Sequence, residues 1–164
     1  MKKVVASILV VILMITSVPF IAAENLPVAT VSKVVSEVTE FFDDGSKIVT
    51  TVCENIDSIG PVSTTYTKNG SKTQTGYNNS GDVMWTFTVN GTFRVVEGTS
   101  ATCTAVSYSH TAPGSGWSLK TASTSKTANR AIGNATFVKK VLLITVDSID
   151  TVCTLYCNVN GELS

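Results

Sequence analysis

Residues 83–96 read VMWTFTVNGTFRVV, and this stretch decides the fold class. Apolar side chains recur at every second position from Val83 to Val95, and polar ones occupy the positions between them from Thr86 to Arg94. Because successive side chains of a strand point to opposite faces, the pattern predicts one long strand with a dry face and a wet face. The pair at 90–91, Asn-Gly, is also a hairpin-turn sequence. The alternation continues through it, which favours an unbroken strand with the glycine at a bend or bulge.

Similar but shorter patterns surround this strand. We expect further strands at residues 47–53, 72–77, 101–110, 117–123, 130–141 and 146–159. The turn residues at 97–99 predict a hairpin, and a tight connection is expected near residues 142–145. About seven to eight strands with regular turns predict an all-β fold: a single antiparallel β-sandwich, immunoglobulin-like or similar, over residues 45–164. A small barrel is the alternative.

Residues 24–44 fit this pattern least well. Valines and phenylalanines recur there at helical spacing, yet β-branched residues form poor isolated helices. We therefore predict a leader segment that is flexible or a short helix.

The first 23 residues have the three parts of a secretory signal peptide. Lys2 and Lys3 form the basic start, residues 4–15 are apolar apart from one serine, and small residues end the segment at Ala23. The alternative is an uncleaved anchor, but the apolar run is shorter than the ~20 residues that a spanning helix needs. Cleavage after Ala23 predicts a secreted, extracellular protein, either free or associated with the cell envelope.

The remaining 141 residues are long enough for one domain with its own core. Without Lys2 and Lys3 they carry ten basic and twelve acidic residues, a net charge of −2. This balance argues against nucleic acid, which needs a concentrated basic face. It also argues against electrostatic capture by an anionic membrane, so no membrane contact is expected after signal cleavage.

Four cysteines, Cys53, Cys103, Cys153 and Cys157, predict structural disulfides in an exported chain. Cys153 and Cys157 are four residues apart on one predicted strand, about 13 Å, which is too far for a bond that needs less than about 7 Å. Two pairings remain: Cys103–Cys157 with Cys53–Cys153, or Cys103–Cys153 with Cys53–Cys157.

No catalytic or cofactor-binding constellation is predicted. His110 is the only histidine, a nucleophile elbow is absent from the sequence, and the acidic pairs Asp43/Asp44 and Asp147/Asp150 do not have EF-hand spacing. Trp85 and Trp117 are expected in the core. Tyr108 and Tyr156 lie on the opposite parity from Cys103 and Cys157, so we expect them to form an exposed aromatic surface.

A resemblance covers most of the chain after residue 44. It is carried by the motifs DGS-x-IVTT at 44–51, WTFTV-x-GTF at 85–93, ATCT at 101–104, W-x-LK at 117–120, ATF at 135–137 and L-x-C-x-x-x-G-x-LS at 155–164. The chain resembles small, uncharacterised β-rich secreted proteins of Gram-positive, Clostridia-like bacteria. The resemblance implies a bacterial host and favours Cys103–Cys157 as the shared disulfide, with Cys53 and Cys153 additional. It implies no activity.

These features together predict a non-catalytic binding or structural module that meets a cell-wall or other extracellular ligand. A secreted antagonist, such as a toxin-like protein or an inhibitor, is the alternative, and a hydrolase is the third reading. A hydrolase would depend on His110 or on the acidic pairs.

Overall fold

The computed structural model describes residues 31–56 and 64–164. The signal peptide, its cleavage point and residues 24–30 of the predicted leader lie outside these ranges. Eight strands occupy the described residues: β1 (Val31–Phe41), β2 (Lys47–Ile56), β3 (Thr65–Tyr77), β4 (Val83–Val96), β5 (Ser100–Thr111), β6 (Trp117–Thr127), β7 (Arg130–Val141) and β8 (Ile144–Tyr156).

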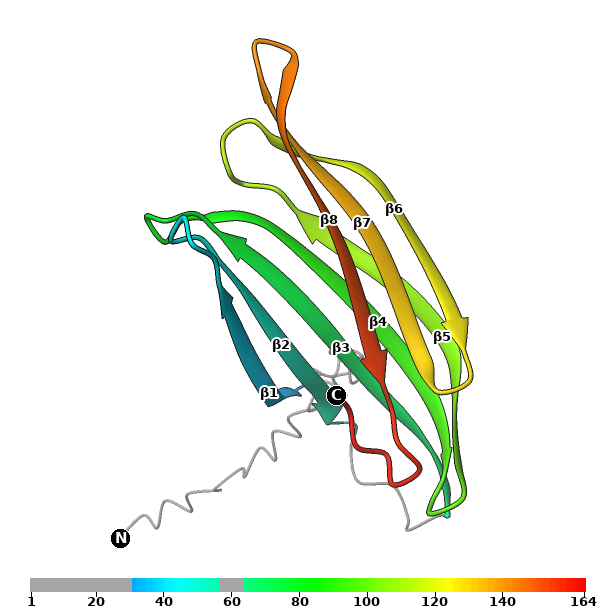
Figure 1. Ribbon diagram of the computed structural model, residues 1–164. Helices are drawn as coiled ribbons and strands as arrows, with labels where there is room; N and C mark the ends of the chain where they lie inside the picture. Colours follow the sequence, from blue (N-terminus) through cyan, green and yellow to red (C-terminus); the bar gives the residue numbers. More distant parts are fainter. Residues whose placement is uncertain (1–30, 57–63) are drawn as a thin grey trace, which may run out of the picture.

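The strands form two antiparallel meanders that pack face to face (Figure 1). The larger sheet has the order β1-β2-β3-β4-β5, and the smaller has the order β6-β7-β8. The all-β sandwich prediction is therefore confirmed, as two separate sheets rather than a closed barrel. The strand order differs from that of immunoglobulin domains, whose two sheets are not successive meanders. Here the chain completes one sheet before it begins the other.

The central strand β4 has the predicted alternation. Trp85, Phe87, Val89, Phe93 and Val95 are fully buried, and the residues between them face outward. Gly91 continues the strand, as expected, and pairs with Gly70 of β3 and Val106 of β5.

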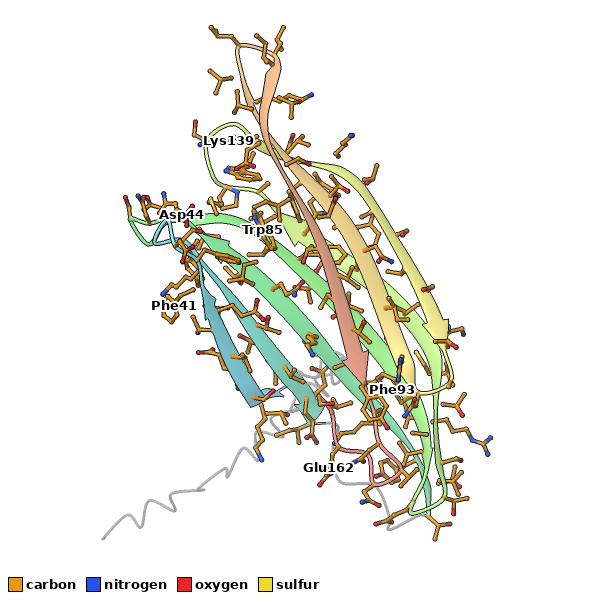
Figure 2. All side chains as sticks on the ribbon, viewed as in Figure 1. Phe41, Asp44, Trp85, Phe93, Lys139 and Glu162 are labelled. Carbon is orange, nitrogen blue, oxygen red and sulfur yellow. The ribbon has the colours of Figure 1, made fainter. Side chains whose placement is uncertain are left out.

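Small residues of β7 leave room for these large side chains of β4. A Cβ atom added to Gly133 would lie 2.4 Å from Val89 Cγ2 and 2.9 Å from Phe87 Cε1. Ala131 and Ala135 continue the same buried face. Larger side chains of β7 and β8 complete the core, where Phe137 stacks on Trp85 with ring centroids 4.9 Å apart. Figure 2 shows Trp85 and Phe93 near opposite ends of the space between the sheets.

The predicted leader is wrong for the part that the structure describes. Residues 31–41 form strand β1, which pairs with β2 along its length. A register shift between Val34 and Ser36 interrupts the alternation. This bulge explains the error, because one extra residue in a strand changes its parity and makes apolar positions resemble a helical spacing.

Other predicted boundaries also shift. β3 begins at Thr65, earlier than the strand expected at 72–77, so Asn69 and Gly70 also lie inside it. Gly70 is required there for packing, since a Cβ atom at this position would lie 2.2 Å from Leu163 Cδ1. Leu163 reaches this point because the C-terminal residues fold back over β8, with Ser164 and Tyr156 exchanging backbone hydrogen bonds.

Candidate functional site

The most exposed apolar feature of the described residues is the end of the β7–β8 hairpin. We define the hairpin tip as residues 141–146, Val-Leu-Leu-Ile-Thr-Val. Leu142 and Leu143 form its apex and are 92% and 94% exposed. Val141, Ile144 and Val146 beside them are each more than half exposed. Figure 1 shows this hairpin extending beyond the ends of the other strands. The tip therefore presents an aliphatic surface that no other segment within residues 31–56 and 64–164 covers.

The backbone of the apex is in an unusual conformation for leucine. Leu142 has φ 49° and Leu143 has φ 70°, the left-handed region that two-residue hairpins of type I′ require at both central positions. Asn-Gly is the favoured sequence in such turns, because these residues tolerate positive φ. Two leucines in their place cost conformational energy and expose apolar surface, so ordinary turn formation does not account for them.

The base of the hairpin is held firmly and carries positive charge. Strand pairing continues to the apex, with Val141 opposite Ile144 and Lys140 opposite Thr145. The Lys140 amide also donates to the Gly116 carbonyl at 2.9 Å, which ties the hairpin to the loop before β6. Lys120 and Lys140 line one shallow hollow beside this base. Figure 2 labels Lys139 below the projecting tip.

The sequence predicts this connection but does not reveal its exposure. The tight turn expected near residues 142–145 is found slightly earlier, at Leu142 and Leu143. The available signal is the apolar run at 141–144, which lacks the Gly, Asn, Asp or Pro that ordinarily mark a turn.

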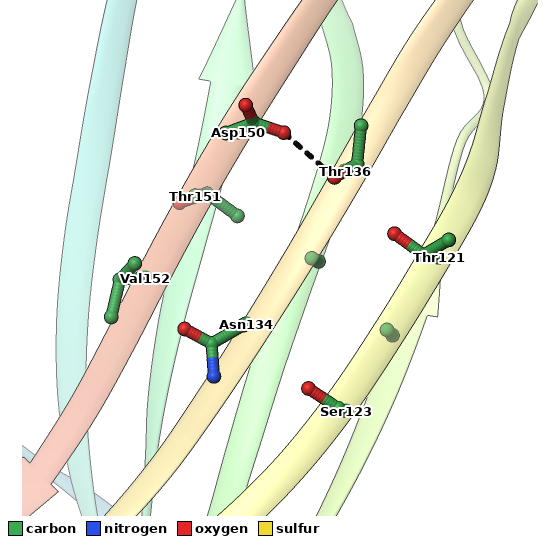
Figure 3. Close-up of a pocket in the computed structure, with 9 residues that line it drawn as sticks. Thr121, Ser123, Asn134, Thr136, Asp150, Thr151 and Val152 are labelled. Carbon is green, nitrogen blue, oxygen red and sulfur yellow. Dashed lines mark hydrogen bonds between the residues drawn. The ribbon is translucent and has the colours of Figure 1, made fainter.

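A second candidate is a polar hollow of about 240 Å³ on the outer face of the smaller sheet (Figure 3). Hydroxyl, amide and carboxylate groups line it, from Thr121, Ser123, Asn134, Thr136 and Asp150. The Thr136 hydroxyl donates to Asp150 Oδ1 at 2.7 Å. Such groups can form hydrogen bonds with a polar ligand, but the aromatic side chains that stack on sugar rings are absent from this lining.

A third candidate is a cleft of about 380 Å³ at the open rim between the sheets. Ile48, Met84 and Ile149 supply apolar walls, and Asp44 lies at the rim. Two hydrogen bonds from Ser46, one from its hydroxyl and one from its amide, hold the pKa of the Asp44 carboxyl below its usual value. Asp44 thus caps its own turn, as aspartates in turns commonly do.

Trp85 also borders this cleft, and its Nε1 atom is buried without a hydrogen-bond partner among the described residues. The indole lies directly against Gly76, where a Cβ atom would be 2.6 Å from Nε1. Because this nitrogen has almost no accessible surface, a molecule in the cleft could not reach it without movement of the protein. The cleft is therefore a weaker candidate than the tip.

The four cysteines are free thiols in the structure, so neither predicted disulfide is present among the described residues. Cys103 and Cys157 nevertheless lie beside the same turn: the Cys103 amide donates to the Ala128 carbonyl, and the Cys157 amide donates to the adjacent Asn129 carbonyl. Burial raises the pKa of the Cys157 thiol to about 11, and the nearby Cys103 adds to the rise. The two thiols are thus neighbours.

The expected pairing of Cys53 with Cys153 is not supported. Val52 faces the core and is 2% exposed, so the adjacent Cys53 faces the outside of the larger sheet. Cys153 lies inside, where its thiol donates to the Lys72 carbonyl at 3.3 Å. Burial raises the pKa of the Cys153 thiol to about 11. The same outward direction of Cys53 argues against its pairing with the buried Cys157.

Tyr108 and Tyr156 do not form the predicted aromatic surface. Tyr108 is 41% exposed, as expected, but a bulge in β5 between Cys103 and Ala105 reverses the parity. The Tyr108 ring therefore lies on the inner side of the sheet, with its centroid 5.7 Å from that of Phe87. Tyr156 alternates with the buried Leu155 and faces the outside of the smaller sheet. The two rings therefore belong to different surfaces.

The remaining residues singled out from the sequence are accounted for by the fold. Trp85 and Trp117 are buried, as predicted. His110 is exposed and lies between aromatic rings, 6.3 Å from Tyr108 and 6.4 Å from Phe137 by ring centroids.

Among residues 31–56 and 64–164, no group of three or more His, Cys, Asp or Glu side chains is arranged to hold a metal ion. No helix in these ranges is long and apolar enough to span a membrane.

Comparison of the chain with protein-family models, with curated proteins and with solved structures finds no match.

Proposed function

We propose that the chain is an exported, non-catalytic binding module whose contact surface is the hairpin tip. The single observation that carries this proposal is the exposure of Leu142 and Leu143, which are 92% and 94% accessible at the apex of a paired hairpin. Isolated exposed apolar residues are common on proteins, whereas a contiguous apolar group usually marks an interaction site.

Export is the second part of the proposal and rests on residues 1–23. The basic start, the short apolar run and the small residues at 21–23 support cleavage after Ala23. The resemblance to secreted proteins of Gram-positive bacteria is consistent with this route. We place the mature protein outside the cell, free or associated with the envelope.

One disulfide, Cys103–Cys157, is part of the proposed exported form. Both residues are nearly or fully buried beside Ala128 and Asn129. A bridge here would close a loop of roughly 50 residues or more, which the chain-entropy model values at roughly 4 kcal/mol. We propose that Cys53 remains a free thiol because it faces away from the interior.

The same tip supports a second candidate function, a secreted antagonist that acts on a neighbouring cell. An apolar projection on a rigid scaffold is suited to contact with a target surface. Growth inhibition of neighbouring strains by the purified protein would favour this reading, and its loss on replacement of Leu142 and Leu143 would tie the activity to the tip.

The experiment for the main proposal is fractionation of producing cells with an antibody to residues after Ala23. We expect protein that begins at Glu24, measured by intact mass, in the medium or in the envelope fraction. Full-length protein in the membrane would contradict cleavage, and full-length protein in the cytoplasm would contradict export.

A further inference from the structure

The hairpin tip requires an environment that water does not provide. Leu142 and Leu143 contribute nothing to the core, since both are almost fully exposed, and they occupy a turn geometry that leucine disfavours. Both features weaken the isolated protein. They are explained if the two side chains are transferred from water to an apolar phase when the protein acts.

We propose that the hairpin tip inserts shallowly into the interfacial layer of a lipid bilayer that carries anionic headgroups. This inference rests on the proposed function, because it names the partner of the proposed contact surface. Insertion would be confined to residues 141–146, with the sandwich remaining outside the lipid.

The chemistry of the tip fits lipid better than protein. Its five apolar side chains are all aliphatic, and they come from the two strands and from the apex between them. Protein interfaces draw most of their binding energy from Trp, Tyr and Arg, and the tip has none of these. Lipid chains do not require shape-matched partners, and they can surround a projection on every side.

The length of the hairpin tip sets the depth to which it can insert into a bilayer. The apex lies two residues beyond the Lys140–Thr145 pair, or roughly 7 Å of backbone at ~3.3 Å per residue. Apolar faces of interfacial segments are buried about 5–10 Å into the headgroup and acyl boundary. The outer edges of a two-stranded ribbon have unpaired backbone groups, which the hydrocarbon core does not tolerate. Shallow insertion matches the length of the tip and also keeps the unpaired backbone groups of the hairpin out of the hydrocarbon core.

Charge at the base of the hairpin is placed for contact with anionic headgroups. Lys139 and Lys140 come directly before the tip, and Lys120 lines the same hollow as Lys140. Asp147 lies opposite Lys139 in the strand pairing, and its Oδ1 accepts from the Ser148 amide at 2.8 Å. Asp82 lines a hollow together with Lys139, so Lys120 and Lys140 are the lysines placed away from these carboxylates. Basic residues near a membrane surface strengthen binding to anionic lipids.

This mechanism differs from the one that the net charge argued against. The charge of −2 predicts no capture of the whole protein by electrostatic attraction. Insertion of the tip depends instead on apolar burial at one end, assisted by the local lysines. The expectation of no membrane contact considered only electrostatic capture of the whole protein and not insertion of an apolar tip.

The test uses the full chain, expressed in an exporting host, with the released form purified and its start determined by intact mass. Flotation is measured with vesicles of phosphatidylcholine alone and of phosphatidylcholine with phosphatidylglycerol in equal parts. The test variant is Leu142→Asn with Leu143→Gly, which suits the turn and keeps the hairpin. The matched control is Val34→Ser with Val152→Ser, since both valines are exposed on the body of the sandwich.

We expect the protein to float with both kinds of vesicle and more strongly with the anionic ones. The Asn-Gly variant should bind roughly 100-fold more weakly, from the loss of two leucine side chains, whereas the valine control should bind as the unchanged protein does. A further variant, Lys139→Gln with Lys140→Gln, should lose the preference for anionic vesicles.

Three results would overturn lipid insertion: no flotation with either vesicle, equal flotation of the Asn-Gly variant, or self-association that the Asn-Gly variant abolishes without any vesicle binding. The last result would assign the tip to a second copy of the chain. Failure of export is distinguishable from failure of lipid insertion, because export is measured by the intact mass and the cell fraction, whereas insertion is measured by flotation of the purified protein.

Discussion

The turn at the apex of the β7–β8 hairpin yields a quantitative prediction about stability. Leu142 and Leu143 have φ values of 49° and 70°. An L-residue in the left-handed region costs roughly 1–2 kcal/mol, and Asn and Gly largely avoid this cost. Because both leucines are almost fully exposed, their removal loses little packing. Replacement by Asn-Gly should therefore stabilise the protein.

The expected gain follows from these contributions. Relief at two positions amounts to about 2–4 kcal/mol, and the greater freedom of glycine in the unfolded chain subtracts roughly 0.5–1 kcal/mol. Residual strain at asparagine reduces the gain further, so we expect about 1–2 kcal/mol. For a domain of this size that corresponds to a rise in Tm of roughly 3–10 °C.

The assay is differential scanning calorimetry, with urea denaturation to show that the midpoint moves while the m-value is unchanged. Gly98→Leu is the matched control, because Gly98 has φ 68° and no atom lies within 4 Å of the position that a Cβ atom would take there. It should destabilise the protein by about as much as Leu143→Gly stabilises it. An Asn-Gly variant that is less stable than the unchanged protein would refute the reasoning.

Three further predictions concern the core. Gly133→Ala should lower the free energy of unfolding by about 1–3 kcal/mol through overpacking, since the new Cβ atom would lie 2.4 Å from Val89 Cγ2. Urea denaturation measures this loss, with Asn134→Ala on the exposed side of the same strand as the control. Trp85→Phe should cost less than Trp85→Ala, which is expected to lose about 3–5 kcal/mol, because phenylalanine keeps an aromatic ring that can stack on Phe137. The third concerns the Cys153 thiol, whose folded-state pKa of about 11 lies above its ordinary value of 9. In reducing buffer, the contribution of this thiol to the free energy of unfolding should be complete below pH 9 and should decline by about 2–3 kcal/mol as the pH rises to 11. The measurement is urea denaturation across this pH range, in which Cys153→Ala should show a smaller decline.

Each of these predictions has a result that would contradict it. Unchanged stability of Gly133→Ala would mean that β7 and β4 do not pack as closely as described. Equal losses for the two tryptophan variants would mean that a phenyl ring at position 85 does not keep the packing against Phe137. An identical pH profile for Cys153→Ala would show that this thiol does not titrate in the folded state as its burial implies.

The predictable part of the fold is the part with uninterrupted alternation. Strand β4 follows the pattern at 83–96 from end to end, and Trp85 and Trp117 are buried as expected. Errors arise where a bulge changes the parity. The shift between Val34 and Ser36 makes β1 resemble a helix, and the bulge after Cys103 moves Tyr108 to the inner side. A bulge depends on the partner strand, so the spacing within a single strand does not reveal it.

The candidate site is harder to predict than the fold. The sequence predicts a tight connection near residues 142–145, but the apolar run at 141–144 does not reveal that this connection is exposed, because apolar residues are ordinarily interior. Its exposure depends on the length of β7 and β8 relative to their neighbours, since β6 begins opposite Lys139 and residues 141–146 extend beyond it and are exposed. Relative strand length is a property of the assembled sheet and is not encoded in any one segment.

The most direct test of the account compares producing cells that express the unchanged chain with cells that express the Asn-Gly variant at 142–143. The quantity measured is the distribution of mature protein between medium and membrane-bound fractions. The account predicts that both proteins are exported and that the variant moves from the membrane-bound fraction to the medium. Equal distributions, with the unchanged protein bound to membranes to the same extent as the variant, would contradict the assignment of the hairpin tip as the contact surface.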